Sequence, residues 1–174
     1  AHWDEKDSFT IEAYTRHGGY KASQKALAMD PDAVIQLVKD SGLRGRGGAA
    51  FPTGIKWRTV LEAPGTTKYI VCNADEGDSG TFADRMLMEG DPFCLIEGMT
   101  IAGVAVGATQ GFIYLRAEYP HAEKALRAAI ARIRLAAETA VRSGQTELFL
   151  TDEAADVDRV PLSMVLAAAA VLSW

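Results

Sequence analysis

Two short β-prone runs separated by a helical segment constrain the fold of this chain most. The runs are Lys68–Cys72, which reads as a buried strand, and Gly111–Arg116. Between them, Asp91-Pro92 is typical of a helix start, because the aspartate can cap the first turn and proline loses no hydrogen bond there. A helical pattern from His121 to about Arg142 follows the second run. Since strands joined through a helix usually lie parallel, this order predicts an α/β fold: a partly parallel sheet with flanking helices.

Further elements are expected on both sides of these runs. Residues 8–22 read as a loop, Ser23–Met29 as a short helix, and Asp30-Pro31 as the start of a helix that ends at Gly42. A third strand is expected at 147–150. We therefore divide the chain into an N-terminal helical segment (1–42), an α/β domain (43–150), and a linker with an apolar tail (151–174). The apolar tail runs from Val160 to Trp174 and is shorter than the ~20 residues that a membrane-spanning helix needs, so we expect no direct membrane insertion.

Residues 42–57 hold five glycines, two arginines, one lysine and two aromatic residues. Glycine lets backbone N–H groups approach a ligand, the cations add positive charge, and aromatic rings offer flat faces. That mixture favours a ligand with a phosphate at one end and a planar heterocycle at the other. The chain as a whole has a formal net charge of -5, so a small anion is favoured over nucleic acid.

Two standard phosphate-binding motifs do not account for this loop. Gly45–Ala50 matches G-x-G-x-x-G/A, but a Rossmann fingerprint follows a strand and opens a helix. Here a helix is expected before the loop, and Pro52 and Gly54 are expected to interrupt the segment after it. The Walker pattern also fails, because no Ser or Thr follows Lys56. A solvated surface loop stays open as an alternative.

A polar turn follows the first strand and contains Asn73, Asp75, Glu76 and Asp78. Open α/β sheets place their ligands at the C-terminal ends of strands. Asn73 can both donate and accept hydrogen bonds, and Asp75 can bind sugar or ribityl hydroxyl groups. A merely solvated turn is the alternative, because these residue types are common in turns. With no histidine nearby and no EF-hand spacing, we expect no metal.

Three runs of the chain together resemble one known family. Ser41–Trp57, Val71–Arg85 and Gly111–Pro120 resemble, in the same order, blocks of the NADH-binding FMN flavoprotein subunit of respiratory complex I. The amino-acid sequences of residues 76–80 and 88–93 resemble more closely those of the diaphorase subunits of soluble NAD-linked formate dehydrogenases and hydrogenases. This resemblance covers about residues 14–132.

The resemblance implies an oxidoreductase subunit with noncovalent FMN and NAD(H) as substrate. Electrons would pass between nicotinamide, flavin and the iron–sulfur clusters of partner subunits. A [4Fe-4S] cluster would belong to the protein only if a further C-terminal part holds it, because Cys72 and Cys94 cannot supply four thiolates. We expect a cytoplasmic subunit of a larger complex, which could be peripheral to a membrane complex, with no nucleic-acid partner.

The family motifs also assign residues to roles. By this resemblance, no side chain is catalytic, since FMN carries the chemistry. The FMN-binding residues would be Gly45, Arg46, Gly47, Gly48, Lys56, Asn73 and Asp75; the NADH-binding residues would be Phe51, Glu76 and Asp78; Tyr114 and Glu118 would complete the pocket. Ala50 departs from the family, which usually has glycine there, and a positive φ would strain it. An incomplete or non-catalytic assembly module with this fold, and another phosphate-ligand enzyme, stay open as alternatives.

Overall fold

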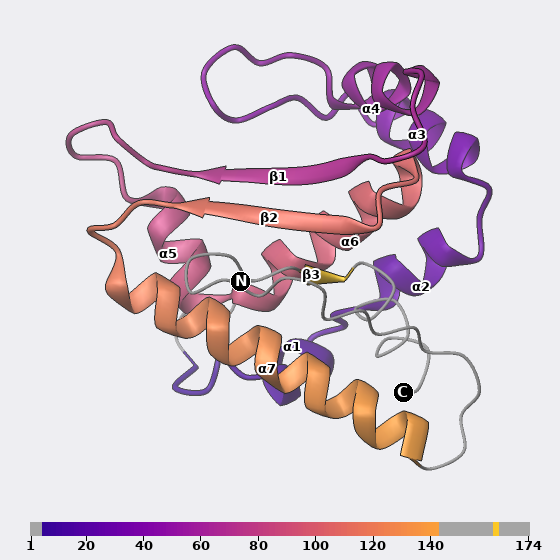
Figure 1. Ribbon diagram of the computed structural model, residues 1–174. Coiled ribbons are helices and arrows are strands. Elements are labelled where there is room, and N and C mark those ends of the chain that lie inside the picture. The colour runs from indigo at the N-terminus through magenta and orange to yellow at the C-terminus, as the bar shows by residue number, and fades with distance from the viewer. Residues whose placement is uncertain (1–4, 143–161, 164–174) are drawn as a thin grey trace.

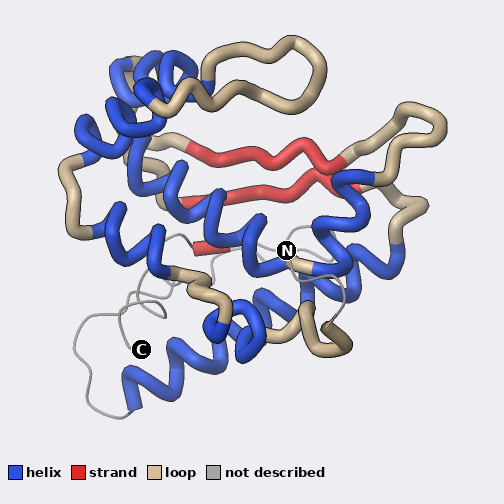
Figure 2. Tube along the Cα trace, turned by 180° about the vertical axis from the view of Figure 1, so that it is seen from behind, coloured by secondary structure: helices blue, strands red, loops and turns tan. Residues whose placement is uncertain are grey.

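The structure is a computed structural model that describes residues 5–142 and 162–163. Within these residues, a layer of helices packs against one face of a small sheet (Figures 1 and 2). In chain order the elements are α1 (Ile11–Arg16), α2 (Lys21–Leu27), α3 (Pro31–Asp40), α4 (Thr53–Glu62), β1 (Tyr69–Ala74), α5 (Ala83–Gly90), α6 (Pro92–Val106), β2 (Gln110–Leu115), α7 (Pro120–Arg142) and β3 (Leu162–Ser163).

The sheet has the order β1-β2-β3. β1 and β2 run parallel, with Tyr69 opposite Gln110 at one end and Ala74 opposite Leu115 at the other. β3 adds a short antiparallel pairing to β2. The crossover from β1 to β2 passes through α5 and α6, as the sequence predicted for a parallel pair. The predicted α/β class with a partly parallel sheet is therefore confirmed.

The two faces of β1 differ, and this corrects the expectation of a buried strand. Ile70 and Cys72 pack against the helices, whereas Tyr69 and Val71 on the other face are 50% and 65% exposed. Side chains alternate across a strand, so a helical layer on one side buries only every second residue. The run of apolar residues gave no sign of this, because Val and Tyr occur on both kinds of strand face.

Helix α6 is the centre of the core and confirms the helix predicted from Asp91-Pro92. The Asp91 carboxylate accepts a hydrogen bond of 3.3 Å from the Cys94 amide, and Gly107 ends the helix with a φ of +74°. Residues of α6 occur in two of the three clusters of buried apolar side chains, through Phe93 and Ile96 in one and Ala105 in another. The helix thus joins the sheet to the N-terminal helices.

The buried carboxylate of Glu97 in α6 forms hydrogen bonds with α1 and with the start of α2. Glu97 accepts hydrogen bonds from the Tyr14 hydroxyl, from the Tyr20 amide (2.9 Å) and from the Ser23 amide (2.8 Å). The sequence predicted a loop where α1 lies, and that prediction is wrong: Thr10 caps the helix by accepting from the Ala13 amide. A helix of only six residues is too short to give a clear periodic pattern.

The division at residue 42 stays a prediction, although helices from both sides of it share one core with α6. The helix expected from Asp30-Pro31 is confirmed as α3, capped by the Asp30 carboxylate. The predicted strand at 147–150 and most of the 151–174 segment lie outside the described residues. In the part of the chain that the structure describes, no helix is long and apolar enough to cross a membrane.

Candidate ligand-binding site

The glycine-rich segment between Arg44 and Pro52 forms an arch, and backbone contacts join its two ends. The Gly45 amide donates a hydrogen bond of 2.9 Å to the carbonyl of Phe51, and Arg44 pairs with Pro52 in an isolated antiparallel bridge. The Arg44 guanidinium also donates to the carbonyl of Ala50 at 3.0 Å. These contacts fix the two ends of the arch against each other.

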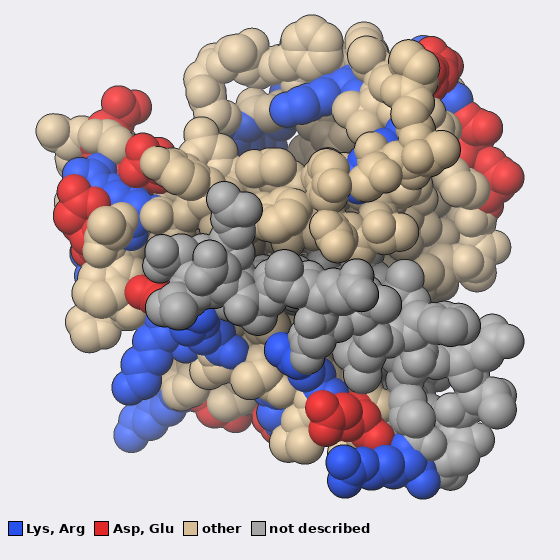
Figure 3. Space-filling view, viewed as in Figure 1, with Lys and Arg blue, Asp and Glu red and all other residues tan. Residues whose placement is uncertain are grey.

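The arch itself stands clear of the rest of the described chain. A Cβ atom added at Gly47 or Gly48 would meet no described atom within 4 Å, and Arg46 is exposed. Gly48 has a φ of +101° and Ala50 a φ of +50°, so Ala50 has the strained positive φ considered from the sequence. Figures 1 and 2 show the arch beyond the free edge of β1, and Figure 3 shows Lys and Arg side chains beneath it. Open backbone and nearby cations together suit an anionic ligand.

A helix follows the arch, which corrects the expectation that Pro52 and Gly54 interrupt the chain. Pro52 stands at the N-cap of α4, where proline is tolerated, and Lys56 falls in its first turns. Gly54 is needed for close packing, since a Cβ there would lie 2.6 Å from the Cα of Lys39 in α3. The Rossmann order is still not met, because α3 and not a strand precedes the arch.

The polar turn lies at the C-terminal end of β1, as the sequence predicted. Asn73 is opposite Tyr114 in the parallel register, and both side chains are exposed. The Asn73 side-chain oxygen accepts a hydrogen bond of 3.2 Å from the amide of Asp75. Asp75 and Asp78 are exposed, with carboxylates available to a ligand. Asn73, Tyr114 and Asp75 therefore meet at one end of the sheet.

Glu76 differs from its neighbours because it is buried within the protein. Its carboxylate accepts hydrogen bonds from the amides of Asp84 (3.1 Å) and Arg85 (3.2 Å), which begin α5, and from the Tyr119 hydroxyl (3.3 Å). Burial raises the pKa of this carboxyl, but the hydrogen bonds outweigh that effect and hold the pKa below its usual value. A contact of Glu76 with NADH stays a prediction, and its described contacts are structural.

Arg116 ties this turn to the loop after β2. Its guanidinium donates a hydrogen bond of 2.6 Å to the backbone carbonyl of Glu76 and forms an ion pair of 3.2 Å with Glu118. Two guanidinium groups lie over the ring of Tyr119, that of Arg85 at 5.6 Å from the ring centroid and that of Arg116 at 5.8 Å. The sequence interpretation included Arg116 only as part of the stretch from Tyr114 to Glu118 that would complete the pocket, and it assigned no role to Tyr119.

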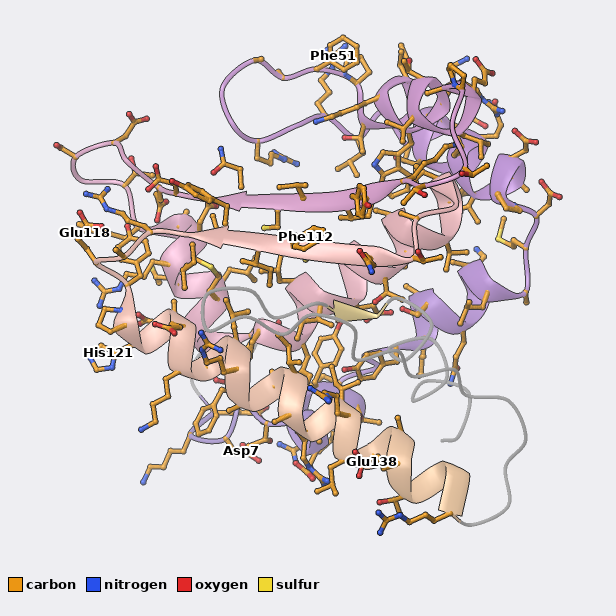
Figure 4. The ribbon with its side chains drawn as sticks, in the orientation of Figure 1. Asp7, Phe51, Phe112, Glu118, His121 and Glu138 are labelled. Atoms are coloured by element: carbon orange, nitrogen blue, oxygen red, sulfur yellow. The ribbon has the colours of Figure 1, made fainter. Side chains whose placement is uncertain are left out.

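The predicted site residues therefore fall into two groups: one on the arch and the start of α4, the other at the C-terminal ends of β1 and β2. Figure 4 places Phe51 on the arch and Glu118 beyond the end of β2.

A cavity of about 220 Å³ lies elsewhere, beside α1 and the start of α6, where Tyr14, Asp91 and Glu97 are among its lining residues. Since no predicted residue lines this cavity, it is not the site that the motifs indicate. Among the described residues, no cluster of three or more His, Cys, Asp or Glu side chains is placed to hold a metal ion.

An open arch of amides and cations beyond the free edge of a parallel strand pair defines an α/β domain suited to a phosphate-bearing ligand. The chain belongs to the Nuo51 FMN-binding domain family, which it matches over residues 38–160. It is 50% identical over 129 residues to an NADH-quinone oxidoreductase subunit of Rhizobium meliloti, with 74% of this chain and 31% of that protein covered.

Other relatives belong to hydrogenases. The chain is 54% identical over 124 residues to the HndC subunit of an NADP-reducing hydrogenase from Solidesulfovibrio fructosivorans, covering 71% of this chain and 25% of that protein. A crystal structure of NAD+-reducing [NiFe]-hydrogenase in the air-oxidized state matches with a TM-score of 0.62 and 42% identity, over 71% of this chain and 22% of the other. The chain thus spans about a quarter to a third of the curated relatives' length.

Proposed function

We propose that this chain binds FMN without a covalent bond and that, in a larger protein, it forms the FMN-binding part of an NADH/NAD oxidoreductase of the diaphorase type. One observation carries this proposal: an arch of open backbone with cations beneath it, in a member of the Nuo51 FMN-binding domain family. Bound FMN supplies the redox chemistry, since it exchanges a hydride with nicotinamide and single electrons with iron–sulfur clusters.

The residues present fit this cofactor. A Cβ at Gly47 or Gly48 would meet no described atom, which leaves room for a ligand against the amides of the arch. Arg46 and Lys56 are exposed cations that would attract the phosphate and favour negative charge on the reduced ring. Gly45 would contribute backbone to the same cradle.

The second group of residues would hold the polar parts of the two nucleotides. Asn73 and Asp75 offer hydrogen-bonding groups for the ribityl chain, and Asp78 lies three residues further along the turn. Phe51 is 53% exposed and offers a flat face against which the nicotinamide would stack. Tyr114 and Glu118 would complete the pocket, where the task of the protein is to hold the two rings together.

We further propose that the protein works as one subunit of a complex, as the names of its relatives state for them. Its partners would be iron–sulfur subunits, either in the cytoplasm or at the cytoplasmic surface of a membrane complex. A [4Fe-4S] cluster would belong to the same protein only if a C-terminal part beyond this chain holds it.

The experiment is a flavin titration of the purified protein, followed by anaerobic addition of NADH. We expect the absorption spectrum of an oxidised flavin and its bleaching by NADH. Lys56→Ala should weaken FMN binding, whereas Lys124→Ala, which removes an exposed lysine from α7, should leave it unchanged. A colourless protein that cannot be reconstituted with FMN would contradict the proposal and favour a non-catalytic assembly module.

A further inference from the structure

We propose that Arg116 is a positioning residue. It holds the polar turn after β1, here called the acidic turn (residues 73–78), in the shape needed to bind nicotinamide. The proposal rests on the proposed function, because it deepens the role of the same site. The geometry that carries it is the hydrogen bond of 2.6 Å from the Arg116 guanidinium to the backbone carbonyl of Glu76. This contact joins the end of β2 to the turn after β1, 40 residues apart in the sequence.

The turn is held at Glu76 from two directions. The Glu76 side chain is anchored to the first amides of α5, and its backbone carbonyl is anchored to Arg116. On either side of this point, short hydrogen-bonded turns carry the exposed carboxylates: Gly77 N donates to Asp75 O at 3.1 Å and Thr81 N donates to Asp78 O at 3.2 Å. Glu76 is thus the fixed point between Asp75 and Asp78.

The guanidinium of Arg116 is itself fixed before any ligand arrives. It pairs with Glu118 and stacks over the ring of Tyr119, while the Arg116 amide donates to the Ala74 carbonyl at 3.4 Å. A planar guanidinium can make these contacts together in a fixed geometry, whereas a lysine ammonium is a compact point charge on a flexible chain. Arg116 therefore presents its donor to Glu76 with little further loss of side-chain freedom.

Loss of this donor should loosen the turn without removing a ligand-binding group. A hydrogen bond that involves a charged donor is worth enough to change a local opening equilibrium by roughly tenfold to a hundredfold. Asp75 and Asp78 would keep their carboxylates but would be held less firmly. We therefore expect weaker NADH binding, with little effect on turnover once NADH is saturating.

Arg85 provides a matched control. Its guanidinium lies on the same Tyr119 ring and pairs with Glu89 on its own helix. Only the backbone amide of Arg85 contacts Glu76, and Arg85→Ala keeps this amide. Arg116→Ala and Arg85→Ala thus each remove one cation from Tyr119, but only the first removes the donor to the turn.

The first measurement is hydrogen–deuterium exchange of the flavin-free protein, which needs no activity. Amide exchange at Gly77, Thr81 and Asp84 should be about tenfold or more faster in Arg116→Ala and unchanged in Arg85→Ala. Arg116→Lys should fall between wild type and Arg116→Ala. Unchanged exchange in Arg116→Ala would overturn the proposal, whether or not the protein binds FMN.

The second measurement is the steady-state kinetics of NADH oxidation by the FMN-loaded protein, with ferricyanide added as the one-electron acceptor that reoxidises the flavin. We expect Arg116→Ala to raise KM for NADH by about tenfold, with kcat within about twofold of wild type. An unchanged KM with faster exchange would overturn the positioning role. Failure of wild type to bind FMN would instead contradict the proposed function, and the exchange result would still decide whether Arg116 holds the turn.

Discussion

The Arg44 guanidinium donates a hydrogen bond of 3.0 Å to the carbonyl of Ala50, a residue with a φ of +50°. Among the non-glycine residues that the structure describes, a positive φ occurs at Ala50 and at Tyr20. An alanine in this left-handed region is strained by its Cβ. The arch is therefore closed at a residue that would not adopt this conformation by itself, and Arg44 helps to hold it there.

Ala50→Gly should stabilise the protein, because glycine adopts a positive φ without strain. We expect the free energy of unfolding to rise by roughly 0.5–1 kcal/mol, measured by urea unfolding. Ala49→Gly is the matched control: Ala49 is the exposed neighbour in the same arch, and glycine there should only add flexibility. Equal effects of the two substitutions would contradict the strain at Ala50.

Arg44→Ala should loosen the neck of the arch and weaken FMN binding. We expect the FMN dissociation constant to rise by about tenfold, because the bond to Ala50 restricts the amides that would face the phosphate. Combining it with Ala50→Gly tests the mechanism. The double variant should lose less affinity than Arg44→Ala alone, since glycine keeps the conformation without strain; strictly additive effects would argue against a shared cause.

Asp78→Ala should change nicotinamide kinetics more than FMN content. Asp78 lies on the exposed part of the acidic turn, beyond the residues expected to contact FMN. We expect a raised KM for NADH with a normal flavin spectrum, measured on protein saturated with FMN. Loss of bound FMN together with normal NADH kinetics would refute this assignment and would place Asp78 at the flavin.

The lowered pKa of Glu76 predicts how the free energy of unfolding depends on pH. Its pKa in the folded protein lies below the ordinary value of 4.5, so the unfolded chain takes up the proton first as the pH falls. The stabilising effect of Glu76 is therefore complete above pH 4.5 and is lost as the pH falls through the folded pKa. Glu76→Gln should cost roughly 1–2 kcal/mol at pH 7, because the α5 cap is weakened.

The cost of Glu76→Gln should shrink in acid, where wild type also loses this charge. Urea unfolding at pH 7 and at pH 3.5–4.5 measures both proteins. Asp75→Asn, an exposed neighbour on the same turn, is the control and should lose little stability at either pH. A cost of Glu76→Gln that is constant across this range would contradict the charged cap.

The sequence predicted those features of the fold that depend on local signals. Asp30-Pro31 and Asp91-Pro92 gave the starts of α3 and α6, because a capping carboxylate and a proline act within one turn. The order of strands and helices gave the parallel pair. The exposure of Tyr69 and Val71 was missed, because it depends on which face of the sheet the helices cover.

The site was predictable as two groups of residues but not as a set of contacts. Gly47, Gly48 and Asp75 lie on the arch and the turn that the motifs indicated. The burial of Glu76 could not be read from its acidic surroundings, since its partners lie in α5 and beyond β2. The contact of Arg116 with the Glu76 carbonyl was not predicted for the same reason, because this bond exists only once the strands pair.

The most direct test of the central claim compares the affinities of FMN and riboflavin for the protein. Binding of each flavin is measured by the quenching of its fluorescence. If the arch and its cations bind the phosphate, FMN should bind about a hundredfold more tightly than riboflavin at low salt, and Arg46→Ala should reduce that ratio. Equal affinities for the two flavins, or no binding of FMN, would contradict the account.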